Sequence, residues 1–397
     1  MLSEAWTLAP TCRTLRAVAI PLRPYPQEAV TGILHDWSRG KRRTILTMPT
    51  GTGKTAVMAY LARYVAERKG RTLILVHTDE LIEQTLQSLA QFGLRAGVVK
   101  ASCREWNPVA VVGSVQTVGR RGNLEGITPK AVSLLVVDEC HFSNAATYQR
   151  VMAHFTSSYQ LGCTATPFRG DRKSLAKAGW DTISYAYPLV DAIQQGWLVR
   201  PNVFRIPTGV DISSVPVAPR GGLEPEHDYV EKRLGSLVDN PARNEQAVDA
   251  YLRHTAGERA LAFGVTVEHA YNLANAFRAN GVLAYAIHGG MDRQERFETL
   301  AAHKRGEFPV LANCAVLTHG YDDPDLRCLV LARPTRSRTL AVQIVGRGLR
   351  PAEDKRFCTI LDLADVSEHK LGIADELRTL LEELAVSCEP DVPEGCG

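Results

Sequence analysis

The segment MPTGTGKT, residues 48–55, has the residue types that bind phosphate groups. An apolar run precedes it and a helical pattern follows, so its backbone N–H groups and the N-terminus of that helix can surround phosphate oxygens. In such a P-loop, Lys54 reaches the β- and γ-phosphates of ATP and the hydroxyl of Thr55 ligates Mg²⁺. Met48 stands where the strict pattern has glycine, and the alternative is a glycine turn before a helix. The other residues expected to line the phosphates are Thr50, Gly51, Thr52 and Gly53.

Two adjacent carboxylates follow an apolar run in the segment LLVVDECH, residues 134–141. Open α/β sheets bind ligands at the carboxyl ends of their strands, which is where this pair is expected. Asp138 can hold Mg²⁺ through water, and Glu139 can position and deprotonate the water that attacks a phosphoryl group. Taken alone, an acidic pair at a strand end is most often the polar start of a loop. The P-loop upstream favours the catalytic interpretation.

A third candidate is the arginine pair in QIVGRGLR, residues 343–350. Arg347 and Arg350 are three positions apart, so on a helix they point the same way and could reach a γ-phosphate as arginine fingers. The alternative is an exposed basic helix face, which is the more common situation for an arbitrary pair of arginines.

These side chains need a scaffold that gathers the ends of strands. Short apolar runs, typical of strands buried on both faces, alternate with amphipathic helical patterns. This alternation predicts an α/β fold with parallel sheets. The expected strands are 44–48, 73–76, 110–112, 134–137, 260–263, 284–287, 310–312, 329–331 and 358–361, and the clearest helices are 55–68 and 267–280.

The length of 397 residues suits two domains. Prolines and glycines concentrate between residues 207 and 225 with little periodicity, as in a loop or an excursion between domains. The boundary is therefore expected between about 180 and 240. The predicted organisation is a first domain at 1–200, a linker at 201–240, a second domain at 241–370 and an acidic tail at 371–397.

Composition limits the class of protein. Apolar residues make up 45% and charged residues 22%, as in soluble globular proteins, and a net charge of +3 is too small to indicate nucleic-acid binding by itself. The 9 cysteines include no CxxC pair, which favours buried thiols in a reducing cytoplasm over zinc ligands or disulfides. No apolar run approaches the ~18 residues of a membrane span, and the N-terminus lacks a signal-peptide pattern. We expect a cytoplasmic protein without membrane contact.

Together, these motifs and several others resemble those of superfamily 2 helicases of the DExH class. The chain is most similar to stand-alone bacterial and phage proteins that resemble the motor part of type III restriction subunits. The resemblance extends from about residue 22 to 365, with all motifs in the family's order. The departures are Thr78 in place of a basic residue, Cys140 in place of alanine and His319 in place of glutamate or arginine. The further segments that carry the resemblance are LRPYPQ (22–27), VHTDELIEQ (76–84), GSVQT (113–117), GCTATPFR (162–169), FGVTVEH (263–269), HGGM (288–291) and LTHGYDDP (317–324).

The resemblance implies two tandem RecA-like P-loop domains that share one site for ATP and Mg²⁺ in the cleft between them. It implies that Gln27 reads adenine and that Asp322 contacts the bound ATP. The residues that would couple this site to a nucleic-acid track are His141, Thr164, Thr166 and Gln343.

The resemblance also implies an ATP-dependent helicase or translocase that grips one strand by phosphate and sugar, without sequence preference. DNA is favoured over RNA, the protein is expected to be a monomer, and replication, repair or recombination proteins are its potential separate partners. The setting implied is the cytoplasm of a bacterium or of a phage-infected host. The residues expected to contact the nucleic acid are Ser114, Gln116, Thr117 and Gly320.

Other functions remain open from the sequence. An RNA helicase and a duplex translocase without strand separation share the same core motifs. A nucleotide-gated clamp without ATPase activity is disfavoured by intact Lys54, Glu139 and Arg350. A complete restriction motor subunit is disfavoured because these 397 residues leave no room for a nuclease.

Overall fold

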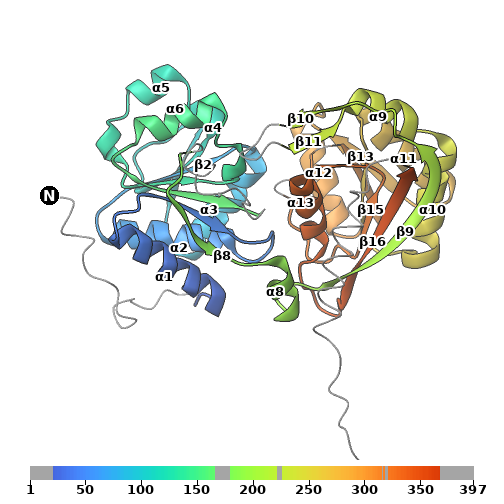
Figure 1. The fold of residues 1–397 in the computed structure, drawn as a ribbon, viewed down its shortest axis with the longest axis horizontal. Helices are drawn as coiled ribbons and strands as arrows, with labels where there is room; N and C mark the ends of the chain where they lie inside the picture. Colours follow the sequence, from blue (N-terminus) through green and yellow to red (C-terminus); the bar gives the residue numbers. More distant parts are fainter. Residues whose placement is uncertain (1–20, 166–178, 221–225, 315, 318–320, 367–397) are drawn as a thin grey trace, which may run out of the picture. The chain divides into compact units, whose positions relative to one another are not determined.

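The computed structural model describes residues 21–165, 179–220, 226–314, 316–317 and 321–366. The chain divides into two compact units, with the main division between Pro188 and Leu189, although Arg220, Glu226 and Tyr321 group with the first unit. Each unit is built around its own mostly parallel sheet (Figure 1). The α/β fold predicted from the alternation of strand and helix patterns is therefore confirmed.

The first unit has an eight-stranded sheet in the order β4-β3-β5-β2-β6-β7-β1-β8. Its strand pairs are parallel, apart from the short antiparallel pair of β3 and β4. The strands are β1 (Arg43–Thr47), β2 (Thr72–Val76), β3 (Ala96–Lys100), β4 (Cys103–Arg104), β5 (Ala110–Ser114), β6 (Leu134–Val137), β7 (Tyr159–Thr164) and β8 (Thr182–Ala186). The helices are α1 (Pro24–Ser38), α2 (Lys54–Glu67), α3 (Asp79–Gln91), α4 (Val115–Val118), α5 (Arg121–Glu125) and α6 (Ala146–His154), with 3₁₀ turns η1 (Pro129–Ala131) and η2 (Cys140–Phe142).

The central strands of this sheet are mostly apolar and buried because helices cover both faces. Every residue of β2 (TLILV) and β6 (LLVV) is buried. The parallel register pairs Thr47 with Thr164 and Val76 with Ser114, so neighbouring strands end at the same edge. This edge gathers the segments that follow β1, β2, β5, β6 and β7.

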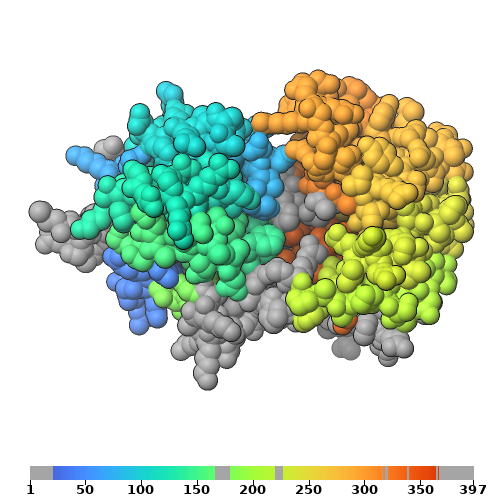
Figure 2. Space-filling view, turned by 90° about the horizontal axis from the view of Figure 1, so that it is seen from above, coloured from blue at the N-terminus to red at the C-terminus, as the bar shows by residue number. Residues whose placement is uncertain are grey.

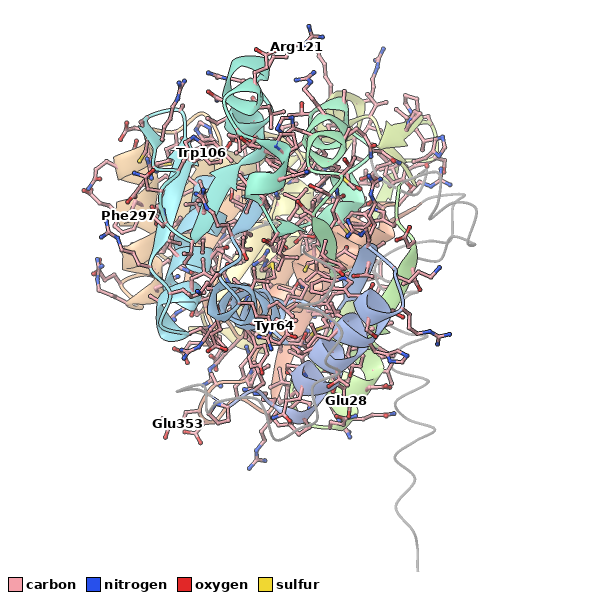
Figure 3. All side chains as sticks on the ribbon, turned by 90° about the vertical axis from the view of Figure 1, so that its left-hand side faces the viewer. Glu28, Tyr64, Trp106, Arg121, Phe297 and Glu353 are labelled. Carbon is pink, nitrogen blue, oxygen red and sulfur yellow. The ribbon has the colours of Figure 1, made fainter. Side chains whose placement is uncertain are left out.

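Helix α1 packs closely against the edge strand β8. A Cβ on Gly32 would lie 2.8 Å from the carbonyl oxygen of Ser184, so only glycine allows this approach. On the outer surface of α1, Glu28 accepts a hydrogen bond of 3.0 Å from the hydroxyl of Tyr185 (Figure 3). These contacts fix the helix that carries Gln27.

The second unit has a six-stranded parallel sheet in the order β13-β14-β12-β15-β16-β9. Its strands are β9 (Arg200–Asp211), β12 (Ala260–Phe263), β13 (Ala284–His288), β14 (Val310–Cys314), β15 (Cys328–Leu331) and β16 (Phe357–Val366), and a separate two-stranded sheet joins β10 (Val217–Arg220) to β11 (Glu226–Tyr229). The helices are α8 (Leu189–Gln194), α9 (Glu231–Val238), α10 (Pro241–Thr255), α11 (Val267–Ala279), α12 (Arg293–Lys304) and α13 (Arg338–Gly348).

The linker predicted at 201–240 is wrong. Residues 200–211 form β9, which pairs with β16 along the edge of the second sheet, and residues 231–238 form α9. Edge strands tolerate proline because one side of their backbone makes no ladder hydrogen bonds, which explains Pro207 inside β9. The residues of β9 alternate between exposed and partly buried, so the strand lacks the continuous apolar run that marks the central strands.

The first unit also ends at Pro188 and not at residue 200 as predicted. In the space-filling view, the yellow-green residues from β9 to α10 form one continuous surface with the yellow and orange residues of the second unit (Figure 2). The predicted acidic tail at 371–397 lies outside the described residues. In the part of the chain that the structure describes, no helix is long and apolar enough to cross a membrane.

Candidate active site

The P-loop connects β1 to α2, and its glycines set its shape. Gly51 (φ 85°) and Gly53 (φ 95°) both have the left-handed backbone conformation that other residues rarely adopt. The hydroxyl of Thr52 donates a hydrogen bond of 2.7 Å to the carbonyl of Pro49, which closes the turn. The loop therefore leads directly into the N-terminus of α2, where backbone N–H groups can surround a phosphate.

Lys54 is the first residue of α2, and its side chain folds over the loop. Its Nζ donates hydrogen bonds to the carbonyls of Met48 (3.0 Å) and Pro49 (3.3 Å). The ammonium group and the positive end of the helix dipole thus lie together, which favours an anion. Thr55 follows Lys54 in the same first turn of the helix, where its hydroxyl could serve a cation bound to that anion.

Met48 departs from the usual P-loop pattern for a structural reason. Its N–H donates a hydrogen bond of 3.1 Å to the carbonyl of Thr164, so it extends the pairing of β1 with β7. Its side chain is completely buried. Met48 therefore belongs to the hydrophobic core, and the chain leaves the sheet to form the loop only after this residue.

The acidic pair follows β6, as predicted. Asp138 and Glu139 are only 6% and 7% exposed. Glu139 has φ 49° and ψ 53°, a left-handed conformation that is strained for a residue with a side chain and is found most often at functional sites. Its N–H donates a hydrogen bond of 3.0 Å to Oδ1 of Asp138.

Burial of this acidic pair brings two negative charges close together. Burial and the charge of Glu139 together raise the pKa of Asp138 to about 7, and the ammonium of Lys54 opposes the shift. Two buried carboxylates are costly unless a cation compensates them. Together with the hydroxyl of Thr55, Asp138 is an oxygen donor of the kind that Mg²⁺ prefers, so these residues fit that ion.

His141 joins the acidic pair to the end of β7. Its Nδ1 lies 3.3 Å from Oε2 of Glu139 and 3.3 Å from the hydroxyl of Thr164. The side chain of Cys140 points into the core beside Gly162, where an added Cβ would lie 2.9 Å from its sulfur. Glycine at 162 therefore makes the room that a cysteine at 140 needs.

His77 is a site residue that the sequence analysis did not single out. It follows β2, the strand that pairs with β6, and its ring meets Phe142 edge-on at 5.7 Å. Burial lowers the pKa of His77, while the negative charge of Glu139 raises it. Glu139 therefore interacts electrostatically with the imidazole of His77 as well as with that of His141. The sequence offered only the position of His77 directly after a buried strand, and the pairing of that strand with β6 was not specified.

Gln27 lies in the first turn of α1, exposed, and its amide donates a hydrogen bond of 2.6 Å to the carbonyl of Leu22. Pro26 is buried in that turn, where a helix tolerates proline. Tyr25 stacks on Tyr187 with ring centroids 4.4 Å apart. The helix thus accommodates Pro26 directly before Gln27, and the role of Gln27 in reading adenine stays a prediction.

The residues expected to contact nucleic acid separate into two groups. Ser114 and Gln116 lie at the end of β5, where the hydroxyl of Ser114 donates to Oε1 of Gln116 (2.7 Å). Thr117 is only 3% exposed, because α4 turns it toward the interior, so the structure does not support a contact through its side chain.

Thr78 caps α3, because its hydroxyl accepts a hydrogen bond of 3.3 Å from the N–H of Leu81, which explains a hydroxyl where the family has a basic residue. Thr166 and Gly320 lie outside the described residues.

Within the second unit, α13 carries Gln343 and Arg347, and Arg350 follows directly. The two arginines are 6% and 9% exposed, so the alternative of an exposed basic face is wrong. Burial lowers the pKa of Arg350 to about 10. Buried guanidinium groups require anionic partners, and Arg350 forms an ion pair with the half-exposed Asp322.

Lys355 fixes the segment of Asp322 to the end of α13. Its Nζ donates hydrogen bonds of 2.8 Å to the carbonyls of Pro324 and Arg350. At Gly348 an added Cβ would lie 2.4 Å from the sulfur of Cys358, so glycine lets α13 approach β16 closely. The second unit thus holds Asp322, Gln343, Arg347 and Arg350 as one group, just as the first unit holds Lys54, Asp138, Glu139, His141 and Thr164.

Comparisons with known proteins match regions in both units. Residues 19–169 match the family model described as "Type III restriction enzyme, res subunit", and residues 243–352 match "Helicase conserved C-terminal domain". The chain belongs to the superfamily 2 helicases. The two matched regions contain the P-loop and acidic pair of this helicase and its arginine pair, respectively.

Individual relatives of the helicase extend the similarity over most of the chain. A candidate mitochondrial ATP-dependent helicase, irc3 of Schizosaccharomyces pombe, is 34% identical over 88% of this chain and 58% of its own length. The chain therefore spans little more than half of that relative. The DNA 3'-5' translocase XPB2 of Sulfurisphaera tokodaii is 24% identical over 89% of this chain and 84% of its own.

A solved structure confirms the fold. A fragment of an HsdR subunit of a type I restriction enzyme from Vibrio vulnificus superposes with a TM-score of 0.70 at 22% identity, covering 88% of this chain and 65% of that chain. The RecA-like fold predicted for the two domains is thus confirmed.

Proposed function

We propose that this helicase hydrolyses ATP with the P-loop and acidic pair of its first unit and uses the energy to move along DNA. The main observation behind the proposal is that Asp138 and Glu139 are both buried at the same sheet edge as the P-loop lysine, and that Glu139 has a strained backbone conformation. A structural acidic pair has no need of burial or strain, whereas a catalytic pair is commonly held in this way.

Each residue of the first unit has a proposed task. Lys54 holds the β- and γ-phosphates, and Thr55 and Asp138 hold Mg²⁺, which would neutralise charge on the phosphates when bound. Glu139 orients the attacking water and accepts its proton. His141 and Thr164 connect this base to the end of β7 and hence to the nucleic-acid track.

The second unit completes the site in this proposal. Arg347 and Arg350 would meet the γ-phosphate when the units close around ATP, and they would stabilise the charge of the transition state. Such arginine fingers contribute ~10³ to 10⁵ in rate. In this scheme Asp322, the ion-pair partner of Arg350, contacts ATP, and Gln343 on α13 links the site to motion.

DNA is the proposed substrate. A relative that this chain matches over 84% of its length is named a DNA translocase. Ser114 and Gln116 are small polar groups suited to phosphate and sugar, which carry no sequence information. We therefore expect movement along DNA of any sequence, by a single copy of the chain.

The proposal is tested by measuring ATPase activity with single- and double-stranded DNA and RNA in parallel, using Lys54→Ala as the inactive control. Stimulation by DNA supports the proposal, and stimulation by RNA alone contradicts the choice of substrate. The absence of stimulation by every nucleic acid contradicts the motor function itself. A strand-displacement assay on a forked duplex then distinguishes unwinding from translocation along a duplex.

A further inference from the structure

The segment taken from the sequence as a linker makes specific buried contacts with the turn before the arginine helix. The polar side chain of Asp228, in β11, is only 7% exposed. Its Oδ2 accepts a hydrogen bond of 2.7 Å from the hydroxyl of Thr335, and its Oδ1 accepts one of 2.8 Å from the N–H of Arg336. A buried carboxylate with partners on a distant segment fixes that segment in place.

The contacts continue from that turn into α13. The hydroxyl of Thr335 accepts a hydrogen bond of 3.1 Å from the N–H of Ser337. The hydroxyl of Ser337 then accepts one of 3.1 Å from the N–H of Leu340, which caps the first turn of α13. A chain of hydrogen bonds thus runs from Asp228 to the N-terminus of the helix that leads to Arg347 and Arg350.

A second set of contacts anchors the same segment. Arg333 donates to Oε1 of Glu231 (2.7 Å) and to the carbonyl of Val265 (3.5 Å). Helix α9 also approaches α11 so closely that a Cβ on Gly235 would lie 2.6 Å from Cγ2 of Thr266. The segment from β11 to α9 is therefore packed against the turns that follow both β12 and β15, and its position is well defined.

We propose that Asp228 is a positioning residue for the arginine pair: it holds the Thr335–Ser337 turn, and through it the start of α13. This inference rests on the proposed function, because it concerns the residues assigned there as arginine fingers. Asp228 itself need not touch ATP. Because a displacement of about 1 Å can cost ~10²-fold in rate, loss of its carboxylate should act mainly on turnover.

Four variants test this assignment. Asp228→Ala removes both acceptors. Asp228→Asn is the conservative rescue, because its oxygen can accept from Arg336 while its amide donates to Thr335. Thr335→Val breaks the same chain from the other side at nearly constant volume. Asp211→Ala is the control, because Asp211 lies exposed on β9 and its described hydrogen bond is a local one of 2.8 Å from the N–H of Ser213.

In a DNA-stimulated ATPase assay, Asp228→Ala and Thr335→Val should lower kcat by ~10-fold or more while KM for ATP changes by less than about 3-fold. Asp228→Asn should recover most of the activity, and Asp211→Ala should match wild type. Combined with Arg350→Ala, Asp228→Ala should cost less than about 2-fold beyond Arg350→Ala alone, because both act through one group. A kcat near wild type in Asp228→Ala, or a full multiplicative loss in the double variant, overturns the proposal.

Hydrogen exchange separates this inference from the proposed function. In Asp228→Ala, the amides of Leu340 and its neighbours in the first turn of α13 should exchange at least ~10-fold faster than in wild type or Asp211→Ala. This result is expected even if the protein shows no nucleic-acid-stimulated ATPase. Unchanged protection of that turn refutes the positioning role, whatever the ATPase assay gives.

Discussion

Oε2 of Glu139 lies 3.3 Å from Nδ1 of His141. Because the same nitrogen lies 3.3 Å from the hydroxyl of Thr164, the candidate base shares one imidazole with the last residue of β7. A change at the end of that strand can therefore reorient Glu139.

Removal of this imidazole should separate ATP hydrolysis from the response to DNA. We expect His141→Ala to reduce stimulation by DNA about 10-fold or more while ATP affinity changes little, because the P-loop remains intact. Equilibrium binding of a fluorescent ATP analogue and ATPase titrations with DNA measure the two effects. His35→Ala, at an exposed histidine of α1, is the matched control. Equal DNA stimulation in both variants would exclude the coupling role.

Glu139→Gln tests the base. The amide keeps the size of the carboxylate but cannot accept a proton, so turnover should fall by ~10² to 10⁴ while ATP binding persists. Glu125→Gln, an exposed change on α5, should behave as wild type. If Glu139→Gln hydrolyses ATP within a few-fold of wild type, another group is the base.

The raised pKa of Asp138 predicts that, in the absence of ATP and Mg²⁺, the stability of the protein depends on pH. Its pKa is raised from 3.8 to about 7, chiefly by burial, so between these values the folded state binds a proton that the unfolded state has lost. Stability from this group therefore falls as pH rises through that range. Asp138→Asn has no titrating carboxyl at this position, so its stability should not fall in this way. The difference in unfolding free energy between Asp138→Asn and wild type should be small near pH 4. It should grow to about 1 to 3 kcal/mol and level off above about pH 7. Urea unfolding in EDTA across this range measures it. A gain that is independent of pH would contradict the account.

Binding to DNA should depend on salt and not on sequence. Contacts to phosphate release counterions, so log affinity should fall linearly with log salt, with nearly the same slope for poly-dT and for mixed sequences. Fluorescence anisotropy with labelled strands measures both dependences. A large difference in affinity between unrelated sequences would indicate readout of bases.

Much of this fold could be predicted because its central strands carry their own signal. The runs at 73–76 and 134–137 are apolar and uninterrupted, which identifies buried parallel strands. The P-loop and the acidic pair follow such strands directly, so their meeting at one sheet edge could be expected. The edge strand β9 gave no such signal, because prolines and half-exposed positions interrupt its pattern.

The contacts that hold the arginine helix could not be predicted. Asp228 and Thr335 are more than 100 positions apart, and neither belongs to a run whose periodicity marks it. His77 was overlooked for a similar reason, since only the pairing of β2 with β6 brings it to Glu139. Long-range polar contacts depend on register and side-chain direction, which a sequence pattern does not specify.

The central claim is that one ATPase uses the P-loop of the first unit and the arginines of the second. The most direct measurement is the turnover number and ATP affinity of Arg350→Ala in the presence of single-stranded DNA, with Arg347→Ala beside it and exposed Arg253→Ala as control. The account predicts a fall in kcat of ~10³-fold or more for Arg350→Ala, with ATP affinity within about 5-fold of wild type. If both Arg350→Ala and Arg347→Ala keep DNA-stimulated turnover near that of Arg253→Ala, the claim is contradicted.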